Sequence, residues 1–350
     1  MNHSGEDSPG LGIWVVRDDL NSKGKIKEVR KLAQEVGASR LYLQVVGRAD
    51  ALYQSDLLPR SEVLNETSSD FDPLGYALEI FAETGIDISV WINVNFVWGF
   101  RGTPSDPRHV IRSHPDWITF DQEGKSMLEY AETDIEELFG VFLDPGLDGV
   151  HDFFSAVASE VASRYDVSEL HFDYLRYPYR TFGYHPSVLE KFKEWSSIRQ
   201  SEGAAYDFDA FRRYLLTEEA RKLHKASSVH NANTSFAVYN CYERRAFHER
   251  LQPWVTWIRD GFPDFAVVMS YEDNVKAVLE SVEEIDDYLD GLSRVRIGLG
   301  AFKMMERPSV LEEMIARLRS FSPDEITLFS FRSIKESAAL RNLLKRMFSG

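Results

Sequence analysis

The chain has 350 residues, of which 43% are hydrophobic and 27% charged, and this composition supports a sizeable core. Its 56 acidic and 40 basic residues give a net charge of −16, which argues against binding to the phosphate backbone of nucleic acids. The single cysteine, Cys241, excludes an intrachain disulfide and a cysteine-based zinc site.

The start of the chain and its hydropathy give expectations about location. Residues 1–10 are polar and acidic and lack the basic and apolar regions of a signal peptide, so we expect a disordered segment. The longest uncharged apolar stretch, residues 88–100, is shorter than the ~20 residues that span a bilayer. As given, the sequence predicts no membrane span and a cytoplasmic location, or export if a leader has been removed.

Eight apolar segments rich in β-branched and aromatic residues recur along the chain, as is typical of strands buried on both faces. We predict strands at residues 13–16, 40–46, 87–96, 169–176, 235–240, 265–272, 295–300 and 325–331. Amphipathic helices are predicted between them, at residues 25–36, from the N-cap Asp72 to Gly85, at 150–164 and at 333–348.

Strict alternation of eight strands and helices predicts an α/β fold, a single (β/α)₈ TIM barrel over residues 11–350. An open doubly wound sheet is the alternative, but the first turn, RDDLNSKG, lacks the glycine pattern of a nucleotide site. A long loop follows the third strand, from Phe96 to about Leu147. We expect it to be functional, because it follows the carboxyl end of a strand, where barrels hold their active sites.

The alternation of side chains along a strand assigns residues to the lumen or to the helix layer. In the fourth strand, Leu170, Phe172 and Tyr174 are predicted to face the helices, which leaves His171 and Asp173 in the lumen. The same rule places several further residues inside the barrel: Ser89, Trp91, Asn93 and Asn95 of the third strand, Tyr42, Gln44 and Arg48 of the second, and Ser270 and Glu272 of the sixth.

Most of these lumen residues also have a structural explanation. Asn93 and Asn95 can satisfy loop backbone, and Arg48 can pair with Asp50. His171 is explained as a hydrogen-bonded core histidine, because no second His or Cys stands at ligand spacing, and no metal site is predicted. Asp173 differs, because a carboxylate inside a barrel is costly unless it is paired or used in function. Arg176 and Arg48 are its candidate partners.

Several stretches of the sequence, in this order, resemble the glycosyl-hydrolase-like 10 (GHL10) family of TIM barrels: LYLQVVGRADALYQSDLLPRSE, FDPLGYALEIFAETGIDISVWINV, SHPDWI, FLDPGLDGVHDF and SELHFDYLRYPY. They run from about residue 11 to 180. The resemblance implies glycoside hydrolysis, with bacterial cell-wall glycan as one expected substrate. The fourth-strand motif of the family commonly has two successive acids. Asp173 matches the first, and Tyr174 stands in place of the second.

Glycoside hydrolysis usually needs two carboxyl groups, one on each side of the scissile bond. We predict Asp173 as the nucleophile or base and Glu272 as the proton donor, with Asp273, Glu243 and Asp18 in reserve. Aromatic residues are expected to stack on sugar rings: Trp98, Trp117, Tyr177, Tyr179 and Tyr271. Polar residues are expected to bind hydroxyl groups: Gln44, Arg48, Asn93, Asn95, His171 and Arg176.

Two other functions remain as alternatives at this point. A non-catalytic carbohydrate-binding TIM barrel would share the aromatic groove but lack a competent proton donor. A metal-dependent hydrolase would need His pairs at strand ends, and the first strand, IWVVRDD, offers none. The sequence predicts an oligo- or polysaccharide partner and no cofactor, and leaves open the sugar, the linkage, the stereochemical outcome and the oligomeric state.

Overall fold

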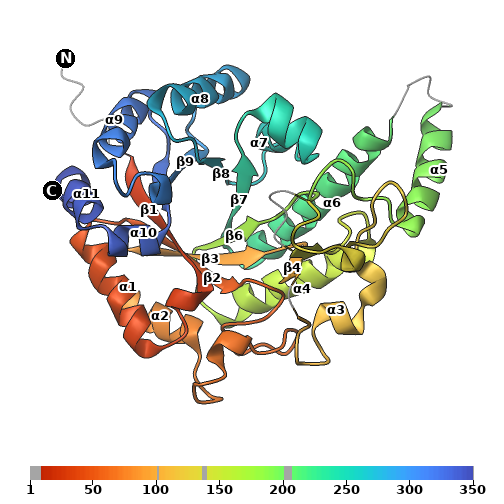
Figure 1. Ribbon diagram of the computed structural model, residues 1–350, viewed down its shortest axis with the longest axis horizontal. Helices are drawn as coiled ribbons and strands as arrows, with labels where there is room; N and C mark the ends of the chain where they lie inside the picture. Colours follow the sequence, from red (N-terminus) through yellow and green to blue (C-terminus); the bar gives the residue numbers. More distant parts are fainter. Residues whose placement is uncertain (1–8, 101, 136–139, 201–206, 350) are drawn as a thin grey trace.

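A computed structural model describes residues 9–100, 102–135, 140–200 and 207–349, so that positions 1–8 of the expected N-terminal segment lie outside the described residues. Eight parallel strands close into a barrel, which confirms the predicted (β/α)₈ fold, and helices surround them (Figure 1). Around the barrel the strands are β1 (Gly10–Val15), β2 (Arg40–Val46), β3 (Asp87–Asn93), β6 (Glu169–Asp173), β7 (Asn233–Tyr239), β8 (Phe265–Ser270), β9 (Val295–Gly300) and β10 (Glu325–Phe329).

The helices of the outer layer follow the predicted pattern. They are α1 (Lys23–Glu35), α2 (Pro73–Phe81), α4 (Asp148–Arg164), α5 (Pro186–Gln200), α6 (Phe208–Ser228), α7 (Trp254–Arg259), α8 (Val275–Leu289), α9 (Pro308–Leu318), α10 (Phe331–Glu336) and α11 (Ala338–Phe348). Asp72 caps α2 as predicted, by accepting a hydrogen bond from the Gly75 N–H. The single predicted helix at 333–348 is divided into α10 and α11, because Ser337 is extended and caps α11.

The last helix closes the outer layer against the first, and in Figure 1 α11 lies beside α1. Gly37, just after α1, has a φ of 70°, and a Cβ atom at this position would lie 2.4 Å from the carbonyl oxygen of Phe348. Only glycine permits both this backbone conformation and this approach. The Lys335 ammonium lies 2.8 Å from a Glu28 carboxylate oxygen, which joins α10 to α1.

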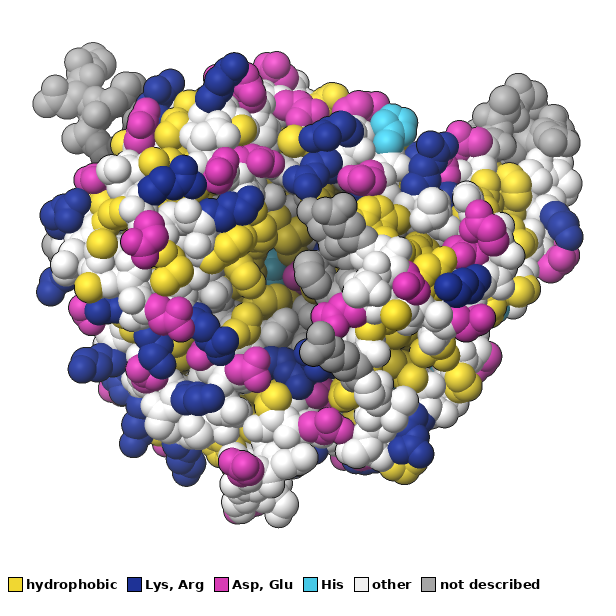
Figure 2. Space-filling view, in the orientation of Figure 1, with side chains coloured by type: hydrophobic (Ala, Val, Ile, Leu, Met, Phe, Trp, Pro, Cys, Tyr) yellow, Lys and Arg dark blue, Asp and Glu magenta, His cyan; other side chains and the backbone are white. Residues whose placement is uncertain are grey.

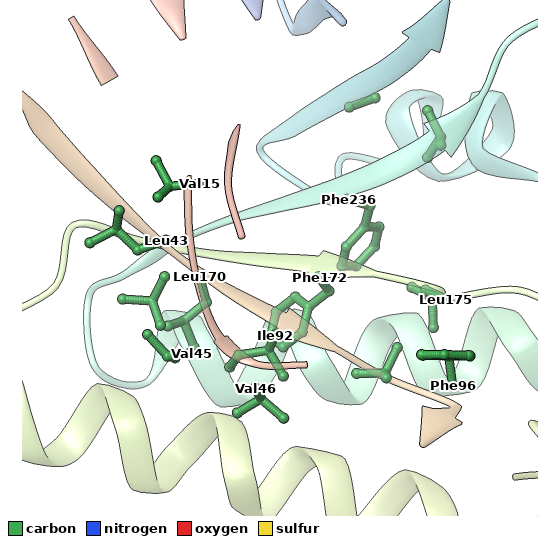
Figure 3. Packing of buried hydrophobic residues seen from close by; sticks show 14 of the residues in the cluster. Val15, Leu43, Val45, Val46, Ile92, Phe96, Leu170, Phe172, Leu175 and Phe236 are labelled. Carbon is green, nitrogen blue, oxygen red and sulfur yellow. The ribbon is translucent and has the colours of Figure 1, made fainter. Parts of the chain in front are cut away.

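Apolar side chains fill the space between the strands and the helices. Figure 3 shows Leu170 and Phe172 of β6 on the side of the helices, as predicted, together with Leu43 of β2 and Ile92 of β3. Phe172 packs edge-to-face on Phe236 of β7, with 6.0 Å between ring centroids. Each such buried side chain contributes about 1.5–3 kcal/mol by leaving water, so this layer supplies much of the stability of the barrel.

The long connection after β3 contains a two-stranded antiparallel ribbon, with β4 (Phe96–Gly99) near its start and β5 (Gly140–Phe142) near its end. The short helix α3 (Val110–Ser113) lies between these strands in the chain. Phe96 and Phe142 pair across the ribbon, with 5.6 Å between their ring centroids. The predicted long loop therefore contains regular structure that extends β3 beyond the barrel.

An ion pair fills the lumen at the amino-terminal end of the strands. Arg296 Nη1 of β9 lies 2.9 and 2.8 Å from the two carboxylate oxygens of Glu169 of β6, and both residues are almost fully buried. The hydroxyls of Ser89 and Ser235 donate to the same carboxylate at 2.8 and 2.7 Å. Burial alone raises the pKa of Glu169, but the guanidinium groups of Arg296 and Arg40 hold it down to about 2.

Removing the cation from this pair should destabilise the fold. We expect Arg296→Met to lower the free energy of unfolding by about 3–5 kcal/mol, because it leaves the buried Glu169 carboxylate with only the more distant guanidinium of Arg40, 3.8 Å away. Denaturant unfolding at pH 7 measures this change. Arg307→Met, which removes an exposed cation 3.6 Å from Asp273, is the matched control and should cost less than about 1 kcal/mol. A loss in Arg296→Met as small as in the control would contradict the role of the pair.

Candidate active site

A cavity of about 660 Å³ opens at the carboxyl ends of the strands. In Figure 2 the same face is hollowed near its centre, where hydrophobic side chains are exposed within a charged rim. Strand ends and the loops after them supply the lining residues: Val16, Arg17, Asp18, Gln44, Gly47, Arg48, Val63, Trp91, Asn93, Phe96, Phe142, Asp173, Tyr174, Arg176, Pro178, Tyr239, Arg250, Met269, Tyr271, Phe302 and Phe329.

A second hollow, of about 570 Å³, lies between the start of α1 and the region of α2. It is lined by residues 22–23 and by residues between 67 and 79, and none of these belongs to a barrel strand. Since active sites of this fold are built at the carboxyl ends of strands, we place the candidate site in the central cavity.

Asp173 is the last residue of β6 and lies in the lumen as predicted, beside Asn93 of β3. Its Oδ1 accepts hydrogen bonds from the Tyr174 N–H at 2.6 Å and from Arg176 Nη1 at 3.0 Å. Its Oδ2 accepts none from the described residues. The side chain is 12% exposed. One oxygen is therefore fixed by the protein, and the other is available at the cavity.

Tyr174 was expected to face the helices, and this prediction is wrong. The strand ends at Asp173, and Tyr174 has a left-handed backbone with a φ of 62°, so side-chain alternation no longer applies. Its ring stacks on Phe96 at 4.7 Å between centroids, and the Arg176 guanidinium lies 4.2 Å from the ring centre. Tyr174 therefore belongs to the wall of the cavity.

Four arginines and two carboxylates line the cavity: Arg17, Arg48, Arg176, Arg250, Asp18 and Asp173. The expected pairing of Arg48 with Asp50 is wrong, because Arg17 occupies that carboxylate at 2.8 and 3.0 Å. Only the backbone N–H of Arg48 reaches Asp50, at 3.1 Å. The Arg48 side chain is exposed near the Trp98 ring, 5.7 Å from its centre, and it forms no ion pair within the described residues. The cavity is thus more basic than the chain as a whole.

The two predicted amide residues Gln44 and Asn93 line the cavity and also serve the backbone. The Asn93 amide donates to the Gly47 carbonyl at 2.9 Å, and its oxygen accepts from Trp91 Nε1 at 2.7 Å. Gln44 accepts from the backbone N–H of Arg17 at 3.3 Å. Tyr271 also lines the cavity as predicted, with its ring 5.7 Å from that of Phe329.

His171 lies in the lumen as predicted, but below the cavity and out of reach of a substrate. It is fully buried, and its Nε2 accepts a hydrogen bond from Trp14 Nε1 at 3.2 Å while Nδ1 lies 2.8 Å from the Ser235 hydroxyl. Burial lowers the pKa of His171 to about 3. The structural explanation therefore fits His171 better than substrate binding.

Asn95 and Tyr177 do not line the cavity. Asn95 follows β3 with a left-handed φ of 61°, and its fully buried amide donates to Glu219 of α6 at 3.0 Å instead of entering the lumen. Tyr177 is also fully buried, near the guanidinium of Arg212 of α6. The predicted lumen and rim positions of these two residues are wrong, because the chain turns outward after both strands.

The two predicted tryptophans lie in the long loop but are not cavity residues. Trp98 is nearly buried and packs edge-to-face on His109. Trp117 stacks on His114, with 3.9 Å between ring centroids. Tyr179 lies under the guanidinium of Arg250, 3.7 Å from it. These aromatic residues support the loops that surround the mouth of the cavity.

Glu272, the predicted proton donor, does not line the cavity. It accepts a hydrogen bond from Asn240 at 3.2 Å and lies 3.6 Å from Arg245. Of the reserve candidates, Glu243 lies 2.9 Å from His248 and Asp273 lies 3.6 Å from Arg307, both at exposed positions. Asp18, just after β1, is the reserve candidate that the structure brings into the cavity with Asp173.

Sequence reasoning missed several cavity residues. Tyr239 was detectable, because it follows Ser235 and Ala237 at strand period on the lumen face of β7. Arg17 directly follows the first strand. Arg250 had no such signal, because it follows a π-helical segment (Tyr242–Glu249) that the sequence pattern does not reveal.

The family of the chain follows from comparison with known proteins. A family model described as "Glycosyl hydrolase-like 10" matches residues 11–299, from β1 into β9. The chain belongs to this family. The GHL10 match therefore extends well past residue 180, where the motifs recognised in the sequence ended.

Two curated relatives are distant from this chain and longer than it. Glycosyl hydrolase YngK of Bacillus subtilis (strain 168) is 23% identical over 239 residues, which cover 64% of this chain and 42% of the relative. Glycosyl hydrolase DigH of Escherichia coli (strain K12) is 28% identical over 153 residues, which cover 40% of this chain and 31% of the relative. The matches thus span less than half the length of either relative.

Solved structures share the barrel of this GHL10 protein. The glycoside hydrolase domain of PgaB (BpsB) from Bordetella bronchiseptica superposes with a TM-score of 0.72 at 13% identity, covering 96% of this chain and 99% of that chain. Alpha-L-fucosidase isoenzyme 2 from Paenibacillus thiaminolyticus gives a TM-score of 0.68 at 12% identity, over 97% and 49% of the two chains. At such identities the likeness establishes the fold alone. Within the described residues, no helix has both the length and the apolar character needed to cross a membrane.

The burial of His171 has a direct spectroscopic consequence. Because burial lowers its pKa to about 3, the ring should stay neutral from pH 5 to 8, where an ordinary histidine titrates. We expect its ring proton and carbon NMR shifts to remain constant over this range. A His171→Gln sample assigns the signal. Titration of His171 near pH 6.5 would refute its placement below the cavity.

Proposed function

We propose that this protein is a glycoside hydrolase that cleaves O-glycosidic bonds of an oligo- or polysaccharide at the central cavity. The observation that supports this most directly is the position of Asp173. It is a largely buried carboxylate at the carboxyl end of a barrel strand, and it is held at the cavity with one oxygen that no described residue hydrogen-bonds. GHL10 membership and the glycosidase-type barrel make this chemistry the natural expectation, and cell-wall glycan is a candidate substrate.

Asp173 is suited to act as the nucleophile or the base. The Tyr174 N–H and Arg176 fix Oδ1, which leaves Oδ2 to approach an anomeric carbon or a water molecule. The same two donors stabilise negative charge on the carboxylate. The short side chain at the end of a strand restricts its position further, and attack by a carboxylate requires such restriction.

We propose Asp18 as the partner carboxyl group, in preference to Glu272. Asp18 lines the same cavity as Asp173, whereas Glu272 is engaged with Asn240 and Arg245 outside it. Asp18 is exposed in the free protein. A glycan bound across the mouth would displace water from Asp18, and loss of water favours the protonated form that a donor needs.

The remaining lining fits a sugar chain. Aromatic faces from Tyr174, Tyr239 and Tyr271 provide stacking surfaces, and the amides of Gln44 and Asn93 lie among them. Arg48, exposed at the rim and without an ion pair in the described part of the chain, can bind hydroxyl or acidic substituents. This mixture of apolar faces and directed polar groups is typical of small-molecule sites.

A carbohydrate-binding barrel without catalysis is the second candidate, and one observation favours it. Asp173 is paired with Arg176 at 3.0 Å, and the family's second acid is replaced by Tyr174. In this case Asp173 would orient Arg176 toward a sugar instead of attacking it. The two candidates predict the same binding surface but different consequences of removing the Asp173 charge.

Asp173→Asn distinguishes the two candidates. We expect kcat to fall by about 10²–10⁴-fold while glycan binding stays within a few-fold, because Asn keeps an oxygen acceptor for Tyr174 and Arg176 but loses the nucleophilic charge. Product mass and release of reducing ends from cell-wall glycan and common polysaccharides provide the assay. Asp166→Asn, an exposed acid before the opposite end of β6, is the control. Full activity in Asp173→Asn would eliminate the proposed role, and wild-type protein that binds glycan without products supports the second candidate.

A comparison of Asp18→Asn with Glu272→Gln identifies the proton donor. If Asp18 protonates the leaving oxygen, Asp18→Asn should reduce kcat about 10²–10⁴-fold for natural glycosides and much less for aryl glycosides with good leaving groups. Glu272→Gln should leave both rates within a few-fold. The opposite pattern would assign the donor to Glu272, and equal losses on both substrates would exclude either residue from that role.

A further inference from the structure

Glu219 and Asn95 form a buried polar contact behind the cavity. Glu219 lies on the barrel-facing side of α6, and both residues have no exposed surface. The Asn95 amide nitrogen donates to Glu219 Oε2 at 3.0 Å. Neither residue lines the cavity, so the proposed chemistry does not use this contact.

The remaining oxygens of the two side chains have no partner among the described residues. Glu219 Oε1 and Asn95 Oδ1 are both buried and both unbonded. An ionised carboxylate and an amide oxygen are both acceptors, so neither can satisfy the other. One proton on Oε1 turns it into a donor and allows a carboxylic acid and a primary amide to join by two hydrogen bonds. Two buried acceptors without partners are costly, and this arrangement removes both.

The charges around Glu219 also disfavour its ionised form. Asp144, from the segment after β5, and Tyr177, from the segment after β6, act on the same buried region. Lys222 of α6 is the nearby cation, but its ammonium pairs with Asp152 of α4 at 2.6 Å. Burial, reinforced by the charge of Asp144, raises the pKa of Glu219 to about 8.

Asn95 connects this contact to the wall of the cavity. Its left-handed backbone turns the chain from β3 into β4, and its carbonyl accepts from the Leu143 N–H at 2.8 Å. The preceding residue, Val94, donates its N–H to the carbonyl of Asp173 at 2.9 Å. The following residue, Phe96, stacks on Tyr174. The orientation of Asn95 therefore affects both the end of β6 and the aromatic wall.

We infer that Glu219 is a positioning residue of the cavity, which acts as a neutral carboxylic acid bound through two hydrogen bonds to the Asn95 amide and so holds the turn that presents Phe96 to Tyr174. The contact between Glu219 and Asn95 is a feature of the fold. Only its effect on turnover rests on the proposed function. Glu219 touches no reacting group and acts only through Asn95.

This inference predicts a pH dependence of stability with a definite sign. The pKa of Glu219 is raised on folding, so the folded state holds a proton that the unfolded state has released. Its contribution to stability is therefore full below about pH 4.5 and is lost as pH rises toward about 8. Glu219→Gln removes the titration but keeps both hydrogen bonds, because the amide supplies one N–H donor and one oxygen acceptor.

The test compares wild type, Glu219→Gln and Glu219→Leu by denaturant unfolding from pH 6 to 8. The wild-type unfolding constant, divided by that of Glu219→Gln, should rise roughly tenfold per pH unit and level off near pH 8. Infrared spectra at pH 6 should show a protonated carboxyl C=O band in wild type that Glu219→Gln lacks. Glu219→Leu should fail to fold or should exchange the Phe96 amide hydrogen faster. A pH-independent ratio, or no carboxylic-acid band, overturns the inference.

Turnover provides the readout that links Glu219 to the site. We expect kcat/KM of the wild type to decline above pH 7 as Glu219 loses its proton. Glu219→Gln should retain activity without this decline, and Glu219→Leu should lose substrate binding at every pH. Loss of activity in Glu219→Gln equal to that in Glu219→Leu would reject the positioning role. If no substrate is turned over by any variant, the proposed function fails, while unfolding and infrared data still decide the protonation of Glu219.

Discussion

Closure of the barrel directs alternate side chains of all eight strands into one lumen. At the amino-terminal end of the strands, the charged side chains in this lumen are compensated by the ion pair between Glu169 and Arg296. The two charges come from β6 and β9, which are separated in the barrel by β7 and β8, and each compensates the other where water is excluded. Serine hydroxyls and Tyr42 complete their hydrogen bonds. Because this ion pair fixes the amino-terminal end of the barrel, the carboxyl ends of the same strands can hold Asp173 in one position.

The site itself depends on how two of the strands end. Asn95, two residues after β3, and Tyr174, directly after β6, both have left-handed backbones. The first turns an amide away from the lumen and toward α6, and the second turns an aromatic ring into the cavity. As a result, Asp173, which is still part of β6, lies beside the aromatic rings of Tyr174 and Phe96, which follow the ends of their strands. The geometry of the candidate site therefore depends on where β3 and β6 end as much as on the alternation of side chains along them.

Sequence periodicity predicted the barrel and the lumen position of Asp173, because alternation is reliable while the backbone is extended. It placed Tyr174 and Asn95 on the wrong sides, because neither residue announces a left-handed turn in the way that glycine does. Glu272 follows β8 in the chain, yet its side chain is held outside by Asn240 and Arg245, which belong to another loop. Asp50 was assigned to Arg48 by proximity in sequence, whereas Arg17 reaches it from the end of the neighbouring strand β1. Contacts between loops from different strands are not encoded in any local pattern.

The packing of the lumen has a consequence for how a polymer can move. Below Asp173 the interior is occupied by Trp14, Tyr42, Trp91 and His171, and beneath them by the ion pair. These four side chains are buried and fill the described part of the lumen beneath the cavity. The proposed glycan substrate would therefore lie across the mouth of the cavity instead of passing through the barrel. In the proposed hydrolysis, substrate and products would share this entrance, so product left in the cavity would block the next substrate until it leaves by the same route.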